Sequence, residues 1–319
     1  MTATVKGRVV RTDAKVCHVD VDGEIVLAAP RGILFDPANA QKNPVAVGDW
    51  VELERAGTPA SLERVLERKN WLSRTASSHD PREQVLAANV DQLLVVASVN
   101  KPGFSSNRTD RILAACVWGH IPAALVLNKI DVAKAHEIEN IRSTYERIPI
   151  DVLETSALDG RGLDALRERL KDKITILYGA SGAGKSSLLN ALQPGFRLKV
   201  GKISRYWETG KHTTSYSQMH ALEFGGFVID TPGIRVFRLH GVPIANVRDL
   251  FPDFRPFQER CHFNGCSHDH EPECAVFDAV DSGELAASRY ATYVELMDEL
   301  RQTRPTGEDE DVDVVADEE

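Results

Sequence analysis

Residues 173–192 read KITILYGASGAGKSSLLNAL, and this stretch decides the fold at the centre of the chain. An apolar, β-branched run of strand length, 173–178, comes first, and an apolar helical run, 187–192, comes last. The glycine-rich segment between them completes the strand–loop–helix context of a phosphate-binding loop. The stretch therefore predicts an α/β domain that binds a nucleotide.

Each part of this loop has a chemical task. Glycines allow backbone N–H groups to turn toward phosphates, and the start of the helix adds positive partial charge. Lys185 places a charge beside the β- and γ-phosphates, which makes it a catalytic candidate, and the Ser186 hydroxyl is a ligand for Mg²⁺. The expected nucleotide contacts are Gly179, Ala180, Ser181, Gly182, Ala183, Gly184, Lys185, Ser186 and Ser187.

A base-recognition element, Asn-Lys-Ile-Asp at 128–131, follows the apolar run 122–127. Ligands of open α/β sheets bind at the carboxyl ends of the strands, where this element lies. The Asp131 carboxylate can accept hydrogen bonds from N1–H and the 2-amino group of guanine, a donor pair that adenine lacks. Downstream, Leu-Glu-Thr-Ser-Ala at 153–157 has the form of a loop whose backbone contacts the guanine oxygen. The expected base contacts are Asn128, Lys129, Ile130, Asp131, Ser156 and Ala157.

A third element, Asp-Thr-Pro-Gly at 230–233, follows the short apolar run 227–229. Asp230 can hold Mg²⁺ through water, and Gly233 can offer its N–H to the γ-phosphate. Upstream lies Gly-Lys-His-Thr-Thr-Ser at 210–215, in which we expect Thr213 or Thr214 to reach Mg²⁺ when GTP is bound. The sequence leaves open which of the two threonines does so.

Ile234 occupies the position at which many signalling GTPases carry a water-orienting Gln. Because isoleucine has no polar side-chain atom, the hydrolytic water has to be positioned from elsewhere, and slow intrinsic turnover is expected. His212 is the catalytic candidate for this task, and a partner or a cation are the alternatives. A histidine on a surface loop, with no catalytic role, is the other interpretation of His212.

The order of the three elements is unusual. Ordinary GTPases place the phosphate loop first and the Asn-Lys-x-Asp element late, whereas here 128–131 precedes 179–186, and 230–233 follows both. Strand-like and helix-like runs alternate through 91–170, which is typical of an α/β fold. The order predicts a circularly permuted P-loop GTPase domain at 80–240.

The N-terminal segment predicts a small β-barrel at 1–75. Five short strands fit an OB-fold, which often binds RNA, and a barrel that serves only as a spacer is the alternative. Asp22-Gly23 predicts a tight turn between the second and third strands. The strand-like runs are 5–11, 15–21, 24–29, 47–53 and 62–66.

The segment 261–274 holds three of the five cysteines in the spacing C-x4-C-x-H-x5-C. Three thiolates and one imidazole form the closed tetrahedral set of a structural zinc site, and His262 and His270 are nearby alternatives for the imidazole. The sequence has no signal peptide and no long apolar span, so we expect a cytoplasmic protein with no membrane partner. In that compartment the cysteines are expected to be free of disulfides. We predict one zinc ion in a mainly α-helical domain at 241–306, held by Cys261, Cys266, His268 and Cys274.

The formal net charge of −9 comes mainly from the C-terminal end. Residues 307–319 carry eight acidic residues and no basic one, which leaves −1 for residues 1–306, and we expect a disordered tail there. Basic residues gather between the phosphate loop and the threonines, either on a solvated loop or at an RNA contact. They are Arg197, Lys199, Lys202, Arg205 and Lys211.

These features closely resemble the ribosome small-subunit-dependent GTPase A family. The permuted order, the His-Thr-Thr loop, Asp-Thr-Pro-Gly and the C-x4-C-x-H-x5-C cluster carry the resemblance, which reaches from residue 1 to about residue 303. It implies an OB-fold, a permuted GTPase and a zinc domain, and hydrolysis of GTP that the small ribosomal subunit stimulates during its late maturation. It also implies rRNA binding and a catalytic role for His212. Lys211 stands where the family often has an arginine, and a lysine keeps the charge but cannot make a bidentate phosphate contact.

Two other functions are compatible with the sequence. One is an RNA-binding module that GTP switches with little hydrolysis, which Ile234 favours. The other is a GTP-dependent metal chaperone that transfers its zinc, which the closed ligand set and the N-terminal barrel disfavour. Under each interpretation we expect a monomer that binds GTP and GDP.

Overall fold

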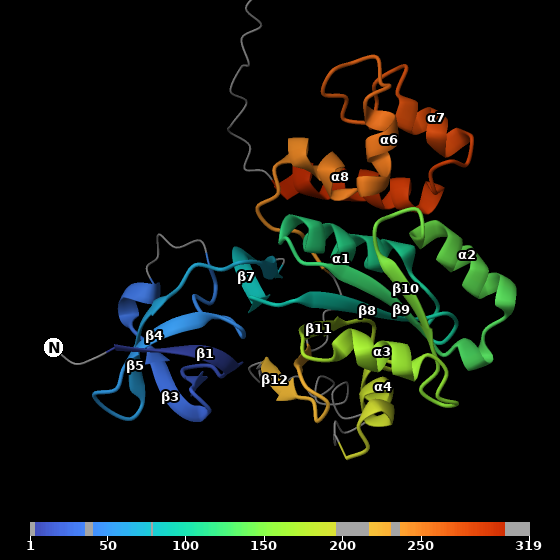
Figure 1. The fold of residues 1–319 in the computed structure, drawn as a ribbon. Coiled ribbons are helices and arrows are strands. Elements are labelled where there is room, and N and C mark those ends of the chain that lie inside the picture. Colours follow the sequence, from blue (N-terminus) through green and yellow to red (C-terminus); the bar gives the residue numbers. More distant parts are fainter. Residues whose placement is uncertain (1–3, 36–40, 78, 196–216, 231–236, 304–319) are drawn as a thin grey trace, which may run out of the picture.

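The structure, a computed structural model, describes residues 4–35, 41–77, 79–195, 217–230 and 237–303. They form an N-terminal barrel, a central sheet with helices on both faces, and a C-terminal helical region, in agreement with the predicted fold class (Figure 1). Some of the predicted functional residues lie outside the described residues. These are His212, Thr213, Thr214, Gly233, Ile234, the basic segment 197–211 and the acidic end 307–319.

The N-terminal barrel has the five strands that the sequence predicted. They are β1 (Thr4–Thr12), β2 (Cys17–Val21), β3 (Glu24–Pro30), β4 (Trp50–Glu54) and β5 (Ala60–Val65), with the 3-10 helix η1 (Gly32–Phe35) after β3. The order is β1-β2-β3-β5-β4, and β4 pairs back onto β1 to close the barrel. Val9, Val51 and Leu62 fill its interior and are fully buried. Asp22 and Gly23 both have positive φ, 54° and 90°, as the predicted tight turn requires.

The central sheet contains five parallel strands and one antiparallel strand. They are β8 (Gln92–Ser98), β9 (Ala123–Asn128), β10 (Asp151–Thr155), β11 (Ile174–Tyr178), β13 (Phe227–Asp230) and the antiparallel β12 (Gln218–Ala221). Their order is β10-β9-β8-β11-β13-β12, and Arg11 of β1 pairs with Gln218 to continue the sheet into the barrel. Because parallel strands end at the same edge, the segments after β9, β10 and β11 meet there with Asp230, the last residue of β13.

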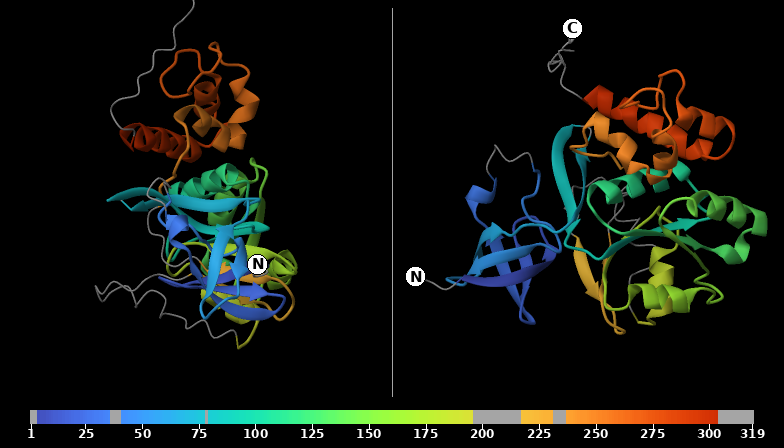
Figure 2. Two further views of the ribbon diagram at one scale, coloured as in Figure 1. Left: turned by 90° about the vertical axis from the view of Figure 1, so that its left-hand side faces the viewer. Right: turned by 45° about the horizontal axis from the view of Figure 1, so that its top comes forward.

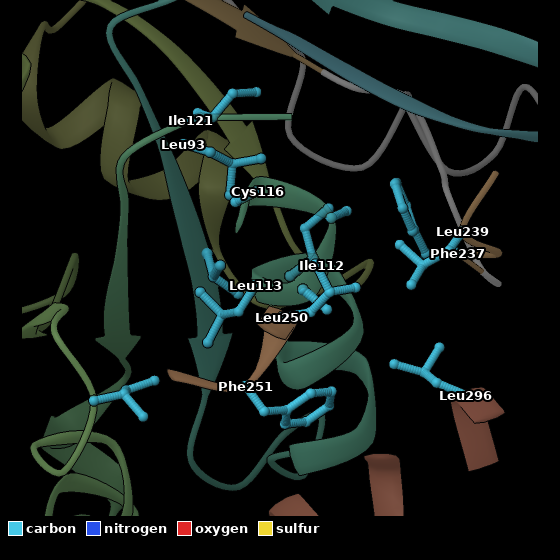
Figure 3. Close-up of a cluster of buried hydrophobic side chains, with 14 of the residues drawn as sticks. Leu93, Ile112, Leu113, Cys116, Ile121, Phe237, Leu239, Leu250, Phe251 and Leu296 are labelled. Carbon is cyan, nitrogen blue, oxygen red and sulfur yellow. The ribbon is translucent and has the colours of Figure 1, made fainter. Parts of the chain in front are cut away.

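Helices cover both faces of this sheet. They are α1 (Ser106–Trp118), η2 (Ile130–Val132), α2 (Ala135–Tyr145), α3 (Leu163–Leu170) and α4 (Lys185–Leu192). Successive residues of β8 point to opposite faces. Leu93 therefore packs with Ile112 of α1 (Figure 3), whereas Leu94 packs with α3 and α4 on the other face. None of the helices within the described ranges is long and apolar enough to cross a membrane.

A hairpin that the sequence did not reveal lies between the barrel and the sheet (Figures 1 and 2). Its strands are β6 (Trp71–Ser77) and β7 (Asp80–Ala88). Leu72 and Ala87 face the main core and are fully buried. Thr75 donates its backbone N–H to the Arg238 carbonyl oxygen (3.0 Å) and its hydroxyl to that of Leu239 (3.1 Å). The hairpin thus fixes the segment that leads from the nucleotide domain to the C-terminal helices.

The C-terminal region packs on the α1 face of the sheet (Figure 2). Its elements are η3 (Ile244–Leu250), η4 (Pro252–Phe254), α6 (Arg255–Gln258), α7 (Ala275–Asp281) and α8 (Ala287–Thr303). The rings of Phe251, Phe254 and Tyr293 form its centre, with centroids 5.0 to 5.4 Å apart. These aromatic residues belong to the same core cluster as α1, so the region is not a separate body tethered to the GTPase domain.

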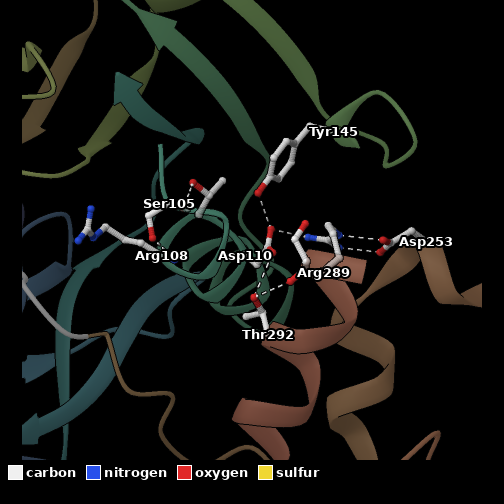
Figure 4. Close-up of polar contacts among 9 residues, drawn as sticks. Ser105, Arg108, Asp110, Tyr145, Asp253, Arg289 and Thr292 are labelled. Carbon is white, nitrogen blue, oxygen red and sulfur yellow. Dashed lines mark hydrogen bonds and ion pairs between the residues drawn. The ribbon is translucent and has the colours of Figure 1, made fainter. Parts of the chain in front are cut away.

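A buried ion network joins α8 to α1 (Figure 4). The Arg289 guanidinium donates to both oxygens of Asp253 (2.6 and 2.8 Å) and to Asp110 of α1 (2.9 Å). The Tyr145 hydroxyl at the end of α2 also donates to Asp110 (2.8 Å). Burial raises the pKa of Asp110, while the Arg289 charge and the Tyr145 hydrogen bond oppose the rise. Removing Arg289 would leave the carboxylates of Asp110 and Asp253 buried without their counter-charge.

Candidate nucleotide and metal sites

The predicted phosphate loop connects β11 to α4. Gly182 and Gly184 have φ of 83° and 102°, a conformation that side chains disfavour. A Cβ on Gly184 would lie 2.1 Å from Asn128 Nδ2, and one on Gly179 would lie 2.1 Å from the Val96 carbonyl oxygen. The glycines therefore allow the loop to approach neighbouring strands more closely than any other residue would.

The base-recognition element holds this loop directly. Asn128 is buried at the end of β9 and donates from Nδ2 to the Ala183 carbonyl oxygen (2.9 Å). Lys129 has a left-handed backbone, φ 65°, and donates from Nζ to the carbonyl oxygens of Gly182 (2.7 Å) and Lys101. Two motifs that lie 53 to 55 residues apart in the sequence thus form one structural unit.

Asp131 and Ser156 also meet. The Ser156 hydroxyl donates to Asp131 Oδ1 (2.7 Å) and accepts from the backbone N–H groups of Leu158 and Asp159, both at 3.2 Å. These contacts orient the carboxylate at the end of β9 beside the loop that follows β10. Ala157 is partly buried next to Ser156, whereas the Ile130 side chain is 8% exposed and packs into the protein.

Lys185 at the start of α4 and Asp230 at the end of β13 carry opposite charges that act on each other. Lys185 Nζ donates to the carbonyl oxygens of Gly179 (2.8 Å) and Ala180 (3.4 Å). Burial lowers the pKa of Lys185 and raises that of Asp230, and each charge opposes the shift of the other. The carboxylate expected to hold Mg²⁺ therefore lies within electrostatic reach of the ammonium group expected to contact the phosphates.

The serines of the loop and the start of α4 lie at its surface. Ser181 and Ser187 are exposed, and Ser186 is partly exposed in the first turn of α4. This helix begins at Lys185, two residues before the predicted start, because the lysine of the loop belongs to the first helical turn. The first turn therefore carries both the charge and the hydroxyl expected at the phosphates.

His220 is a residue near the site that the sequence did not single out. It pairs with Val228 on β13, two residues before Asp230. Burial lowers the pKa of His220, and the Asp230 charge opposes this; the histidine in turn opposes the rise in the pKa of Asp230. A single histidine on a four-residue strand gives no sequence signal, so only the pairing of β12 with β13 reveals its position.

The four predicted metal ligands lie together. Ligand atoms of Cys261, Cys266, His268 and Cys274 are all within 4.8 Å of one another, and His268 Nδ1 lies 3.6 and 3.4 Å from the Sγ atoms of Cys261 and Cys274. Tetrahedral bonds of about 2.3 Å to sulfur and about 2.0 Å to nitrogen place such atoms about 3.5 Å apart. The four residues can therefore hold a metal ion.

The protein around the metal cluster shifts the pKa values of Cys266 and of Glu271 beside it. Burial raises the pKa of the Cys266 thiol to about 12, so a cation has to supply the charge that keeps it a thiolate. Burial also acts to raise the pKa of Glu271, but backbone N–H groups, led by that of Ser267 (2.7 Å), outweigh it and lower that pKa. His262 and His270, the alternative ligands, are exposed.

Residues 65–240 match the RsgA GTPase family. A Bacteroides fragilis protein named "Small ribosomal subunit biogenesis GTPase RsgA" is 35% identical over 304 residues, 93% of this chain and 98% of the relative. A protein of the same name from Chlorobaculum parvum is 40% identical over 273 residues, 82% of this chain and 87% of the relative. The similarity thus extends well beyond the nucleotide-binding segment.

Solved structures show the same architecture. The crystal structure of YjeQ from Thermotoga maritima matches with a TM-score of 0.72 and 32% identity, covering 95% of this chain and 100% of that chain. YloQ, described as a circularly permuted GTPase, matches with a TM-score of 0.67 and 29% identity, covering 95% and 97%. These matches confirm the fold class predicted from the order of the motifs.

Proposed function

The chain belongs to the RsgA GTPase family, and on this premise we propose that it hydrolyses GTP while bound to the small ribosomal subunit during late maturation of that subunit. The chain is a GTP hydrolase acting in ribosome biogenesis. One observation carries the proposal for the site: the base element, the phosphate loop and Asp230 come together at the carboxyl edge of the permuted sheet. Asn128 and Lys129 join the first two through hydrogen bonds.

The geometry supports specific roles around GTP·Mg²⁺. Asp131, oriented by Ser156, accepts from the guanine, and the backbone of 156–157 lies beside it. The phosphate loop residues 179–187 surround the phosphates, with Lys185 as the neutralising charge. Ser186, Asp230 and one of Thr213 and Thr214 hold Mg²⁺, which supplies further charge neutralisation when bound, and Gly233 contacts the γ-phosphate.

The metal cluster is proposed as one structural zinc site. Its three thiolates and one imidazole would fill all four positions of a tetrahedral ion, and three of the four residues are buried. A metal chaperone would need an exposed route for ligand exchange, so the burial favours a structural ion. The Tyr290 hydroxyl donates to the His268 carbonyl oxygen (2.9 Å), which ties the ligand loop to α8.

We propose four parts with separate tasks. Residues 1–75 form an OB-fold that contacts rRNA, 80–240 the GTPase, 241–306 the zinc domain, and 307–319 an acidic tail. The small subunit with its rRNA, GTP and GDP are the proposed partners of a monomer acting in the cytoplasm. Exposed Trp50 on the barrel, with Lys6 Nζ 4.7 Å from its ring centroid, supports an RNA contact there because bases stack on aromatic rings flanked by cations.

We predict that Asp131→Asn weakens GTP binding by roughly tenfold or more, because a charged acceptor for the guanine N–H groups is lost. The amide can donate a hydrogen bond, so the variant should gain affinity for xanthosine triphosphate. Equilibrium titration with both nucleotides measures the change. Asp164→Asn, at an exposed carboxylate in the first turn of α3, is the matched control and should leave both affinities unchanged. Unaltered GTP affinity of Asp131→Asn would contradict the assignment.

We also predict that free protein hydrolyses GTP slowly and that small subunits stimulate it. The basis is Ile234, which cannot orient water, and the basic segment 197–211, whose phosphate contacts would make stimulation weaken as salt rises. Phosphate release by wild type and His212→Ala, with and without subunits at two salt concentrations, tests both points. Fast hydrolysis by the free protein rules out activation by the subunit. Equal stimulation of His212→Ala leaves activation intact but removes His212 from catalysis.

A further inference from the structure

Two short strands place a glutamine directly opposite Asp230, the carboxylate expected to hold Mg²⁺. β12 and β13 pair antiparallel, and the first residue of β12, Gln218, faces the last residue of β13, Asp230. Residues that face each other across an antiparallel pair point to the same side of the sheet, with Cβ atoms about 4.5–5.5 Å apart. The side chain of Gln218 therefore starts beside that of Asp230.

This pair lies on the face of the sheet where the phosphate loop leads into α4. Val228, two residues before Asp230, belongs to the same buried cluster as Leu188 of α4, whereas Ile229 packs in the core on the α1 face. Since successive residues of a strand point to opposite faces, Asp230 lies on the α4 face, and so does Gln218. Both residues are only partly buried, so the amide can turn toward the carboxylate.

The Asp230 carboxylate has charged neighbours but no hydrogen-bond donor within the described ranges. Lys185 and His220 act on its pKa through their charges, and no hydrogen bond contributes to the shift. A carboxylate that holds a metal is usually hydrogen-bonded itself, because an outer partner fixes its orientation. Ser156 does this for Asp131 at the other end of the nucleotide site. A donor of the same kind is therefore expected beside Asp230.

The Gln218 amide is the donor in the right place. Its Nε2 carries two N–H groups and no charge, so it can donate to a carboxylate without displacing a cation from it. The side chain makes no hydrogen bond to the part of the chain that the structure describes. His220, the other polar residue of β12, faces Val228 and reaches Asp230 only along the diagonal, where the spacing is about 7–8 Å.

The N-terminal barrel fixes the register that this contact needs. β12 lies between β1 of the barrel and β13 (Figure 1). Arg11 of β1 pairs with Gln218, and the Thr12 N–H donates to the Ser217 carbonyl oxygen (3.2 Å). A slip of β12 by one residue would turn Gln218 to the α1 face. Because β12 has only four residues, pairing on both sides keeps the amide opposite the carboxylate.

We propose that Gln218 is a positioning residue for Asp230 when GTP·Mg²⁺ is bound. Its Nε2 donates to one carboxylate oxygen and leaves the other for water on the metal ion. This role rests on the proposed function of Asp230, which is to hold Mg²⁺ through water. Gln218 acts only through Asp230 and touches neither the nucleotide nor the reacting atoms. Its loss therefore weakens the hold on Mg²⁺ and leaves the metal-free nucleotide site as it is.

The test measures how Mg²⁺ strengthens the binding of a fluorescent, non-hydrolysable GTP analogue to the full chain. Gln218→Met replaces the amide by an apolar side chain of similar length. We expect the Mg²⁺ concentration for half-maximal strengthening to rise about tenfold. Affinity for the analogue in EDTA and the melting temperature of the ligand-free protein should not change. Gln302→Met, at an exposed glutamine near the end of α8, is the matched control and should behave as wild type.

A double-mutant cycle with Asp230→Ala identifies the partner of the amide. Asp230→Ala alone should raise the required Mg²⁺ concentration, and Gln218→Met added to it should change nothing further. The positioning role is overturned by an unchanged Mg²⁺ requirement in Gln218→Met, by an equal loss of affinity in EDTA, or by a tenfold effect that persists without the carboxylate. An unchanged Mg²⁺ requirement in Asp230→Ala would refute the assignment of Asp230 itself, and with it this role.

Discussion

Lys185→Ala is expected to lower the rate of GTP hydrolysis by at least about a hundredfold, because the variant lacks the charge that neutralises the β- and γ-phosphates. The structure adds a second effect. Lys185 opposes the rise in the pKa of Asp230 more than His220 does, so its removal takes away the main positive charge acting on this buried carboxylate and weakens the proposed Mg²⁺ ligand as well. Steady-state phosphate release with saturating small subunits measures the rate.

Two further variants separate these effects. Lys171→Ala removes an exposed lysine after α3 and should leave hydrolysis unchanged. Lys185→Arg keeps the charge and should preserve the ionised state of Asp230 while altering the fit to the phosphates. Hydrolysis by Lys185→Ala within a few-fold of wild type, with an unchanged melting temperature, would show that the phosphates bind elsewhere.

Loss of one metal ligand, by Cys266→Ala, is expected to abolish binding of about one zinc per chain and to destabilise the C-terminal region by several kcal/mol. The reason is that one metal ion would tie Cys261, Cys266, His268 and Cys274 together, so metal binding and local folding are coupled. Metal analysis and hydrogen exchange over residues 241–303 measure the two effects. Chelation of the wild-type protein should reproduce the same exchange pattern.

Cys116→Ala is the matched control. Cys116 is 1% exposed but lies on α1, away from the cluster, so its loss should cost only about 1 kcal/mol and leave the metal content unchanged. A Cys266→Ala protein that retains metal and full protection from exchange would contradict a structural zinc site. Retained protection after loss of the metal would instead favour exchangeable metal binding.

Local patterns predicted much of the fold. The apolar runs at 122–127 and 173–178 became buried parallel strands because both of their faces are covered, so continuous hydrophobicity was a sufficient signal. The five barrel strands were also recognised, although β4 begins at Trp50 rather than at the predicted Val47. There the backbone turns at Gly48, φ 94°, and Asp49 Oδ2 accepts from the Ala46 N–H (2.8 Å).

Features that depend on tertiary contacts could not be predicted in the same way. The β6–β7 hairpin contains register shifts near Ser73 and Thr75, which interrupt the alternation that identifies a strand. The relation of His220 to Asp230 depends on the pairing of two short strands. The contact of Ser156 with Asp131 follows from the permuted sheet, whereas the residue types alone suggested only that these two segments share a ligand.

The Asp110–Arg289 contact has a consequence for synthesis of the protein. The two residues are 179 positions apart, and α8 is the last described helix to leave the ribosome. At roughly 5–20 residues per second, Asp110 waits roughly 10–35 s for its guanidinium partner. During that interval the carboxylate stays hydrated, because burying it unpaired is costly, and the face of α1 that carries it cannot close. Arrival of α8 therefore completes the packing of α1, a helix synthesised much earlier.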